Sequence, residues 1–208
     1  MIRENYITSS CLIGKQGICK NEALLYKNEE ISLQDFFLAA YRHFELNYPK
    51  FHKMDNLSKL GWLATEVLLK DSFPTGKYEA KDVGVVLANA SSSLDTDIKY
   101  FETTKEIASP ALFVYTLPNI VIGEICIRHH FKGENAFFIF EAFDAGFIEQ
   151  YVSNLLNNNI LQACICGWVE LLDNEYKTVL FLIEKKAAGQ NILFTKENIN
   201  KLYLSENG

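Results

Sequence analysis

Residues 133–170, GENAFFIFEAFDAGFIEQYVSNLLNNNILQACICGWVE, decide the fold because three different signals follow one another in them. Ala136–Phe140 is a continuous apolar run, which is typical of a strand covered on both faces. From Phe143 to Leu156 the apolar residues take a helical spacing, and three asparagines then stop the pattern. Ile160–Trp168 is a second apolar run. The stretch therefore predicts a strand, a sharp elbow, a helix and a strand.

A strand-to-helix elbow is a common place for a catalytic nucleophile. The first turn of a helix presents free N–H groups and the positive end of its dipole. The elbow here consists of Glu141, Ala142, Phe143 and Asp144. None of these is an evident nucleophile, and Asp144 is interpreted as a helix cap rather than a general base.

Composition narrows the class of protein. The chain has 208 residues, 49% of them apolar, which is ordinary for one globular domain with a real core. Its net charge of −6 argues against nucleic-acid binding, which needs clustered Lys and Arg. No apolar stretch reaches the ~20 residues of a membrane span. The sequence therefore predicts a soluble, cytoplasmic protein with neither nucleic acid nor membrane as a partner.

Neither the cysteines nor the histidines form a pattern typical of metal sites. The five cysteines include no C-x-x-C pair, so reduced and buried thiols are expected. Cys164 and Cys166 flank Ile165 on a predicted strand and are expected on opposite sheet faces. The four histidines are interpreted as structural or solvated, because adjacent His129 and His130 diverge. We predict no metal and no cofactor.

The same two patterns recur along the rest of the chain. Strand patterns occupy three further segments: Tyr6–Ile13, Asp82–Asn89 and Thr178–Ile183. Helical patterns occupy five further segments: Leu33–Phe44, Leu57–Lys70, Leu94–Glu106, Leu117–His130 and Glu197–Leu204. Two glycines interrupt helices: Gly61 is tolerated at some cost, and Gly123 is expected where two backbones pack closely. The last two strands, from Ala163 and from Lys177, should form an antiparallel hairpin.

Several segments resemble the N-terminal half of β-ketoacyl synthases, in the thiolase superfamily. These are KMDNLSKLGWLATEVLL (Lys53–Leu69), VGVVLANASSSLDTDIKYF (Val83–Phe101), SPALFVYTLPNIVIGEICIRHHFKG (Ser109–Gly133) and the opening stretch. Pro118, Asn119 and Gly123 carry the most specific part of the resemblance. Together the segments cover the chain from about Met54 to Glu184.

The resemblance implies a fold class. It is α/β, half of a thiolase-like fold: three layers, with a mixed five-stranded sheet, a β-α-β-α-β-α-β-β core and helices on both faces. The expected division is a ketosynthase-like N-terminal domain over residues 1–186 and a C-terminal tail over 187–208.

The same resemblance implies that the family's chemistry is missing. The family reads T-A-C-x-x-G across the elbow, and counting back three residues from Gly146 places its Cys at Phe143. A phenyl ring offers no nucleophile, acid or base. The family's active-site histidines come from its C-terminal half. We therefore assign no catalytic residue and expect no Claisen condensation by this chain.

Half a fold implies partners. Apolar residues on the central helix need a cover, because each is worth ~1.5–3 kcal/mol when buried. A second copy, a different ketosynthase-like subunit or the tail from Ala187 could supply it. A homodimer or heterodimer through Ala136–Phe140 is the first expectation. An acyl carrier protein is acidic, and Arg42, Lys50 and Lys53 are its expected docking residues.

Two functional hypotheses remain open. The first is a catalytically degenerate ketosynthase-like protein, a non-catalytic partner or scaffold in fatty-acid or polyketide-type biosynthesis, such as aryl-polyene or flexirubin systems. The second is an acyl-transfer or thioester-hydrolysing enzyme with Ser91, Ser92 or Ser93 as nucleophile. Against the second, the sequence places no His or carboxylate beside that loop, and a Ser-rich turn is usually only a turn.

Overall fold

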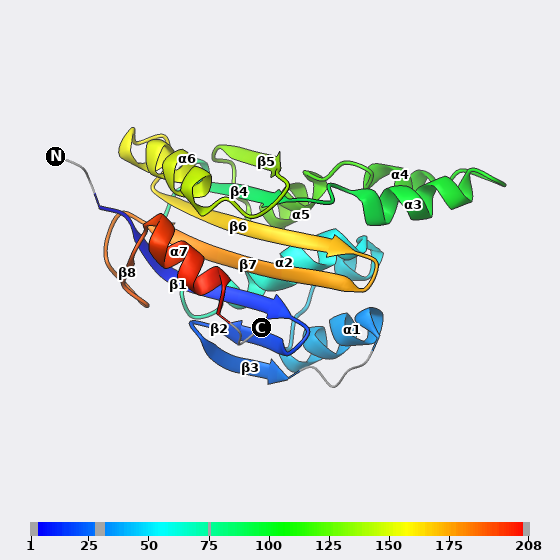
Figure 1. The fold of residues 1–208 in the computed structure, drawn as a ribbon, viewed down its shortest axis with the longest axis horizontal. Coiled ribbons are helices and arrows are strands. Elements are labelled where there is room, and N and C mark those ends of the chain that lie inside the picture. Colours follow the sequence, from blue (N-terminus) through cyan, green and yellow to red (C-terminus); the bar gives the residue numbers. More distant parts are fainter. Residues whose placement is uncertain (1–3, 28–31, 75, 206–208) are drawn as a thin grey trace.

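The computed structural model describes residues 4–27, 32–74 and 76–205 of the chain. Its strands form one mixed sheet in the order β3-β2-β1-β7-β6-β4-β5, with β8 paired to β1 (Figure 1). The strands are β1 (Tyr6–Gly14), β2 (Gly17–Lys20), β3 (Ala23–Lys27), β4 (Val83–Asn89), β5 (Asn135–Ile139), β6 (Ala163–Leu172), β7 (Glu175–Glu184) and β8 (Ile192–Leu193). The helices are α1 (Leu33–His43), η1 (Pro49–Lys53), α2 (Asn56–Leu69), η2 (Ala80–Asp82), α3 (Leu94–Thr103), α4 (Pro110–Val114), α5 (Ile120–His129), α6 (Ala145–Asn157) and α7 (Lys196–Tyr203).

The predicted fold class is confirmed. Five neighbouring strands, β1-β7-β6-β4-β5, make the expected mixed core, in which β4 runs parallel to β5 and β6 while β7 pairs antiparallel with β6 and β1. Three short strands that the sequence analysis missed extend this core. β2 and β3 follow the tight turn after Gly14. They were interpreted as a loop because each is short and ends in a lysine, and β8 has only two residues.

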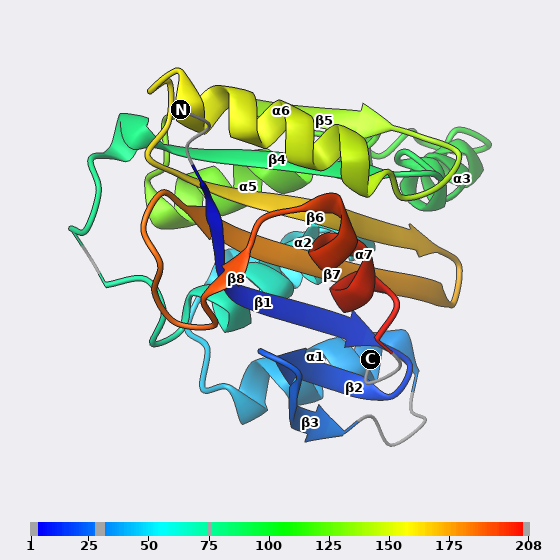
Figure 2. The same ribbon diagram turned by 60° about the vertical axis from the view of Figure 1, so that its left-hand side comes forward.

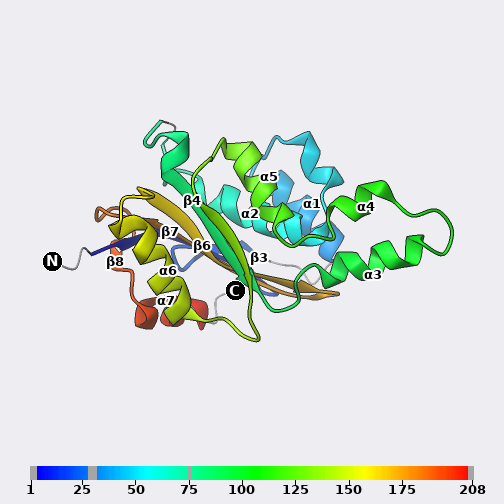
Figure 3. The same cartoon turned by 90° about the horizontal axis from the view of Figure 1, so that it is seen from above.

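Helices cover both faces of the sheet. In Figures 2 and 3, α6 and α7 lie on one face, while α1, α2 and α5 lie on the other. Each face has its own buried core. Cys164 and Cys166 both belong to the core under α6, and Ile165 belongs to the opposite core. The expectation that the two cysteines face opposite ways was wrong, because residues two apart on a strand share a face.

The close approach between helices lies at a different glycine from the one expected. A Cβ on Gly61 of α2 would lie 2.4 Å from the Cγ2 atom of Val121 on α5. A Cβ on Gly123 would meet nothing within 4 Å. Gly61 is therefore the residue that lets α2 and α5 pack together, and Gly123 faces open space.

Strand β5 is an edge strand. Among the described residues it pairs only with β4, and its residues are half-buried or exposed. Ile139 is 48% exposed. The expectation of a strand covered on both faces was wrong, because a continuous apolar run also suits an edge strand whose aromatic side chains pack on a helix.

The segment between β4 and α5 projects from the body of the molecule as an arm (Figures 1 and 3). It contains α3, which ends three residues before the predicted Glu106, and the unpredicted helix α4. Several of its large apolar side chains are exposed: Ile98, Phe101, Ile107, Phe113 and Leu117. The arm thus carries a group of exposed apolar side chains.

Residues after 186 pack on the same sheet as the rest of the chain. β8 pairs with β1. The predicted weak helix is confirmed as α7, which buries Ile199 and Leu202 in the core that contains Ile148 and Val152 of α6. The C-terminal segment therefore covers one side of α6, which was one of the three expected covers.

Candidate functional site

The elbow lies between the end of β5 and the start of α6. Asp144 is the N-cap of α6, and its Oδ1 atom accepts a hydrogen bond of 2.9 Å from the N–H of Phe147. This confirms the interpretation of Asp144 as a cap. Its carboxylate already satisfies one of the free N–H groups that an anion at this helix end would use.

Phe143, the residue before the cap, is enclosed by aromatic rings. The ring of Tyr203 from α7 stacks on it with a centroid distance of 4.3 Å and an interplanar angle of 24°. Trp168 of β6 meets it edge-on at 5.9 Å. The Nζ atom of Lys177 lies 4.3 Å from the centroid of Tyr203. The half-buried ring of Phe143 therefore packs against side chains from β6 and α7, and residue 143 brings no reactive group to the elbow.

The thiols of the chain are not activated. Burial raises the pKa of Cys126 to about 11 and raises the pKa values of Cys11 and Cys164 further. Burial is the main cause that raises the pKa of Cys166, and the neighbouring Cys164 is a smaller cause. A thiol is nucleophilic as its thiolate. These four cysteines are consequently protonated near neutral pH.

The serine loop after β4 is held by a carboxylate from β6. The Oε2 atom of Glu170 accepts hydrogen bonds from the N–H groups of Ala90 at 2.6 Å and Ser91 at 3.3 Å. Glu170 thus occupies two donors that could otherwise bind an anion. Sequence reasoning missed it, because nothing local links residue 170 to residue 90.

The three candidate serines make structural contacts. Ser92 has a left-handed backbone with φ of 53°, and its N–H donates to the side chain of Asn89 at 3.0 Å. The Ser93 hydroxyl donates to the carbonyl of Thr116 at 2.8 Å and so ties the loop to the arm. None of the contacts described for these serines is with a histidine. The Ser93 hydroxyl also lies 3.2 Å from the Oδ2 atom of Asp97, so the expectation that no carboxylate lies beside this loop was wrong. The described contacts stabilise a turn and include a carboxylate, but none of them brings a histidine to these serines.

The basic residues predicted to dock a carrier differ in their surroundings. Lys50 forms an ion pair of 2.8 Å with Glu124 of α5, whose side chain is only 5% exposed. Arg42 and Lys53 are exposed, and neither forms an ion pair with another described residue. Arg128 lies 5.2 Å from the ring centroid of Tyr48, next to η1. The ion pair therefore joins η1, which contains Lys50, to α5, and Arg128 of α5 lies over Tyr48 at the start of η1.

A buried carboxylate that the sequence analysis missed lies beside this surface. Glu66 of α2 is paired with His129 at 2.9 Å and with Arg128 at 3.2 Å. Burial opposes ionisation of Glu66, but the hydrogen bonds from His129 and Arg128 and their charges lower its pKa overall. His129 stacks on Phe131 with a centroid distance of 5.3 Å. These contacts give His129 a structural position on α5.

Two further features bear on binding. Over residues 4–27, 32–74 and 76–205, no cluster of three or more His, Cys, Asp or Glu side chains could hold a metal ion. Within the same ranges, no helix has both the length and the apolar character needed to cross a bilayer.

Comparison with known proteins bears on the fold. No family model and no curated protein matches the sequence. Solved structures do match it. The ishigamide ketosynthase/chain length factor superposes with a TM-score of 0.66 at 16% identity, over 87% of this chain and 62% of its own. A type II polyketide synthase acyl-carrier protein in complex with its ketosynthase gives 0.64 at 16% identity, over 88% and 63%. The chain has a ketosynthase-like fold.

A third structure of this kind is a ketosynthase in complex with its chain length factor from Xenorhabdus doucetiae. It has a TM-score of 0.54 at 12% identity, and the match covers 88% of this chain and 79% of the other. The chain spans less than two thirds of the length of the first two structures. At these identities the comparison shows a likeness of fold, and the fold includes β5, the elbow and α6.

Proposed function

We propose that this chain is a catalytically degenerate ketosynthase-like protein, which acts as a non-catalytic partner in fatty-acid or polyketide-type biosynthesis. The observation that supports the proposal is Phe143 at the elbow, the position at which the resemblance places the ketosynthase cysteine. Tyr203 and Trp168 pack against this ring. The buried thiols with raised pKa values and the hydrogen-bonded serine loop offer no replacement nucleophile.

The partner in this proposal is another ketosynthase-like subunit, either a second copy or a different chain. Edge strand β5 offers unpaired backbone groups, which favour strand addition. Beside it four half-buried rings pack on one another: Phe138, Phe140, Phe147 and Tyr151. A shallow hollow of about 290 Å³ lies over this cluster on α6. Two of the similar solved structures are a ketosynthase/chain length factor and a ketosynthase in complex with its chain length factor, which supports a pairing of this kind.

A carrier protein is the second proposed partner. Arg42 and Lys53 are exposed and without an ion-pair partner among the described residues, so they can meet acidic groups. Lys50 contributes less to docking, because it neutralises Glu124. One similar structure contains an acyl-carrier protein in complex with its ketosynthase. The proposed role is to pair with a synthase and help position its carrier.

The pairing is tested by a charge placed on the edge strand. Ile139→Lys should shift the species measured by light scattering from dimer to monomer, or abolish co-purification with a ketosynthase from the same organism. Ile160→Lys is the matched control, because Ile160 is 50% exposed, close to the 48% of Ile139, and lies beyond the far end of α6. A wild-type chain that is monomeric and binds no ketosynthase would overturn the proposal.

Labelling with a fluorophosphonate separates this proposal from the hydrolase hypothesis. Wild-type protein should remain unlabelled, because the described contacts of the serine loop include the carboxylates of Glu170 and Asp97 but no histidine to act as general base. Labelling that disappears in Ser91→Ala, Ser92→Ala or Ser93→Ala would instead establish an enzyme.

A further inference from the structure

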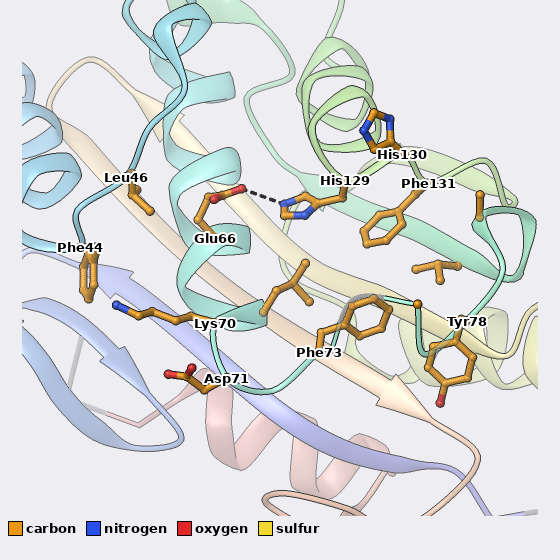
Figure 4. Close-up of a pocket in the computed structure, with 14 residues that line it drawn as sticks. Phe44, Leu46, Glu66, Lys70, Asp71, Phe73, Tyr78, His129, His130 and Phe131 are labelled. Atoms are coloured by element: carbon orange, nitrogen blue, oxygen red, sulfur yellow. Dashed lines mark ion pairs between the residues drawn. The ribbon is translucent and has the colours of Figure 1, made fainter.

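A groove lies on the face of the sheet that α1, α2 and α5 cover, whereas the elbow lies on the face covered by α6 (Figures 2 and 3). Figure 4 shows the residues that line its main part. Its main part is a cavity of about 590 Å³ between the C-terminal turn of α2, the loop that follows it, and the end of α5. A second hollow of about 270 Å³ shares three residues with it, Phe44, Lys70 and Asp71. The two hollows therefore adjoin. The volume of the main cavity is within the range of small-molecule sites, about 300–1,000 Å³.

One wall of the main cavity is aromatic. Phe73 meets Phe131 edge-on with a centroid distance of 5.8 Å, and Tyr78 lies 5.8 Å from Phe73 on its other side. Figure 4 shows these three rings together along one side of the cavity. Rings fixed by one another form a rigid apolar wall, against which an apolar molecule can pack without ordering the wall first.

The charges of the groove are unequal. Glu66 lines the cavity, but its carboxylate is already paired with Arg128 and lies 2.9 Å from the ring of His129. At the junction of the hollows Lys20 and Lys70 accompany one carboxylate, Asp71. The Nζ atom of Lys20 donates to the carbonyl of Lys70, so the two lysines are neighbours. Lys70 has its Nζ atom 6.0 Å from the ring centroid of Phe44 and makes no ion pair within the described part of the chain. The junction thus has one cation more than its carboxylate can balance.

We propose that this groove binds a small anionic amphiphile, with its apolar body against Phe73 and Phe131 and its anionic group at Lys70. The apolar wall favours an apolar body, and the unpaired ammonium group of Lys70 favours an anionic group. A neutral apolar molecule would leave the ammonium without a partner. The groove and the elbow lie on opposite faces of the sheet. The proposal therefore does not rest on the proposed pairing.

The test is a fluorescence titration of the full chain with cis-parinaric acid, a fluorescent fatty acid, and with its neutral methyl ester. The acid should bind saturably at one site and more tightly than the ester. Lys70→Glu should weaken binding of the acid about tenfold, since a hydrogen bond to a charged group is lost and repulsion is added. Ala80→Trp should abolish binding of both, because Ala80 is exposed and lines the cavity, which a large ring there would fill.

Controls separate the groove from other apolar surface. Lys105→Glu removes an exposed lysine on the arm and should leave binding unchanged. Tyr151→Lys alters the aromatic cluster on α6 and should also leave it unchanged. Non-saturable binding by the wild type would overturn the proposal. So would binding of the acid by Lys70→Glu and Ala80→Trp as tight as that of the wild type, or a loss of binding only in Tyr151→Lys. Circular dichroism of each variant shows that it is folded.

Discussion

Tyr203 stacks on Phe143 with a centroid distance of 4.3 Å, although 60 residues of sequence separate them. The contact brings the last described helix onto the elbow at the start of α6. Two consequences follow for the molecule. The elbow has a cover within this chain, whereas Phe147 and Tyr151 of α6, in the aromatic cluster beside β5, stay half-buried.

The stacked pair should contribute measurably to stability. We expect Tyr203→Ala to lower the free energy of unfolding by about 2 kcal/mol, because it removes an aromatic pair and uncovers Phe143. Urea denaturation followed by circular dichroism measures the change. Leu204→Ala is the control, since Leu204 is the next residue and is 69% exposed. Equal effects of the two substitutions would contradict a specific role for the ring.

The two glycines of the α2–α5 pair should respond in opposite ways to the same substitution. Gly61→Ala places a Cβ 2.4 Å from Val121 and should destabilise the protein by about 1–3 kcal/mol through overpacking. Gly123→Ala meets open space and should stabilise the helix by up to about 1 kcal/mol. Thermal unfolding of both variants measures the difference. A neutral Gly61→Ala would mean that α2 and α5 lie farther apart.

Glu66 should make stability depend on pH. Removing its charge in Glu66→Gln leaves Arg128 and His129 without their anion, and we expect a loss of about 2 kcal/mol at pH 7. Because the folded-state pKa of Glu66 is lowered, its contribution is present above the ordinary pKa of about 4.3 and is lost as the pH falls through the folded value.

Urea titrations at pH 7 and at acidic pH test this dependence. The difference between wild type and Glu66→Gln should shrink on acidification. Glu79→Gln is the control, because Glu79 forms only an exposed pair with Lys81 and should have little effect at either pH. If the difference in stability between wild type and Glu66→Gln grew on acidification, the expected pH dependence of Glu66 would be contradicted.

Alkylation should show that the thiols are unreactive near neutral pH. The pKa of about 11 for half-buried Cys126 means that its reaction with iodoacetamide should be slow at pH 7 and should rise about tenfold per pH unit up to pH 9. Mass spectrometry identifies the labelled site, and Cys126→Ser should remove most of the slow labelling. Rapid labelling of any cysteine at pH 7 would instead reveal an activated thiol.

Charge reversal should divide the three basic residues into two groups. Arg42→Glu and Lys53→Glu should weaken binding of an acyl carrier protein by about threefold to tenfold at low salt and leave stability unchanged. Lys50→Glu should lower stability, because it places a carboxylate beside buried Glu124. Lys186→Glu is the control for a general change in net charge. Unchanged carrier binding in the first two variants would remove this surface as a docking site.

Hydrophobic periodicity was sufficient to predict the main helices and strands, the antiparallel final hairpin and the α/β class. It also located the elbow at residues 141–144 and showed that no nucleophile lies there. These features depend on neighbouring residues, because each helix or strand sets the spacing of its own apolar positions. Asp144 could be recognised as a cap for the same reason.

Tertiary structure decided which of these elements meet. Periodicity marks an apolar face but does not say which element will cover it, so it could not pair Tyr203 with Phe143 or Glu66 with His129. It also could not distinguish Gly61 from Gly123, or a central strand from the edge strand β5. Each of these depends on the distance between residues far apart in the sequence, and that distance is set only when the layers pack together.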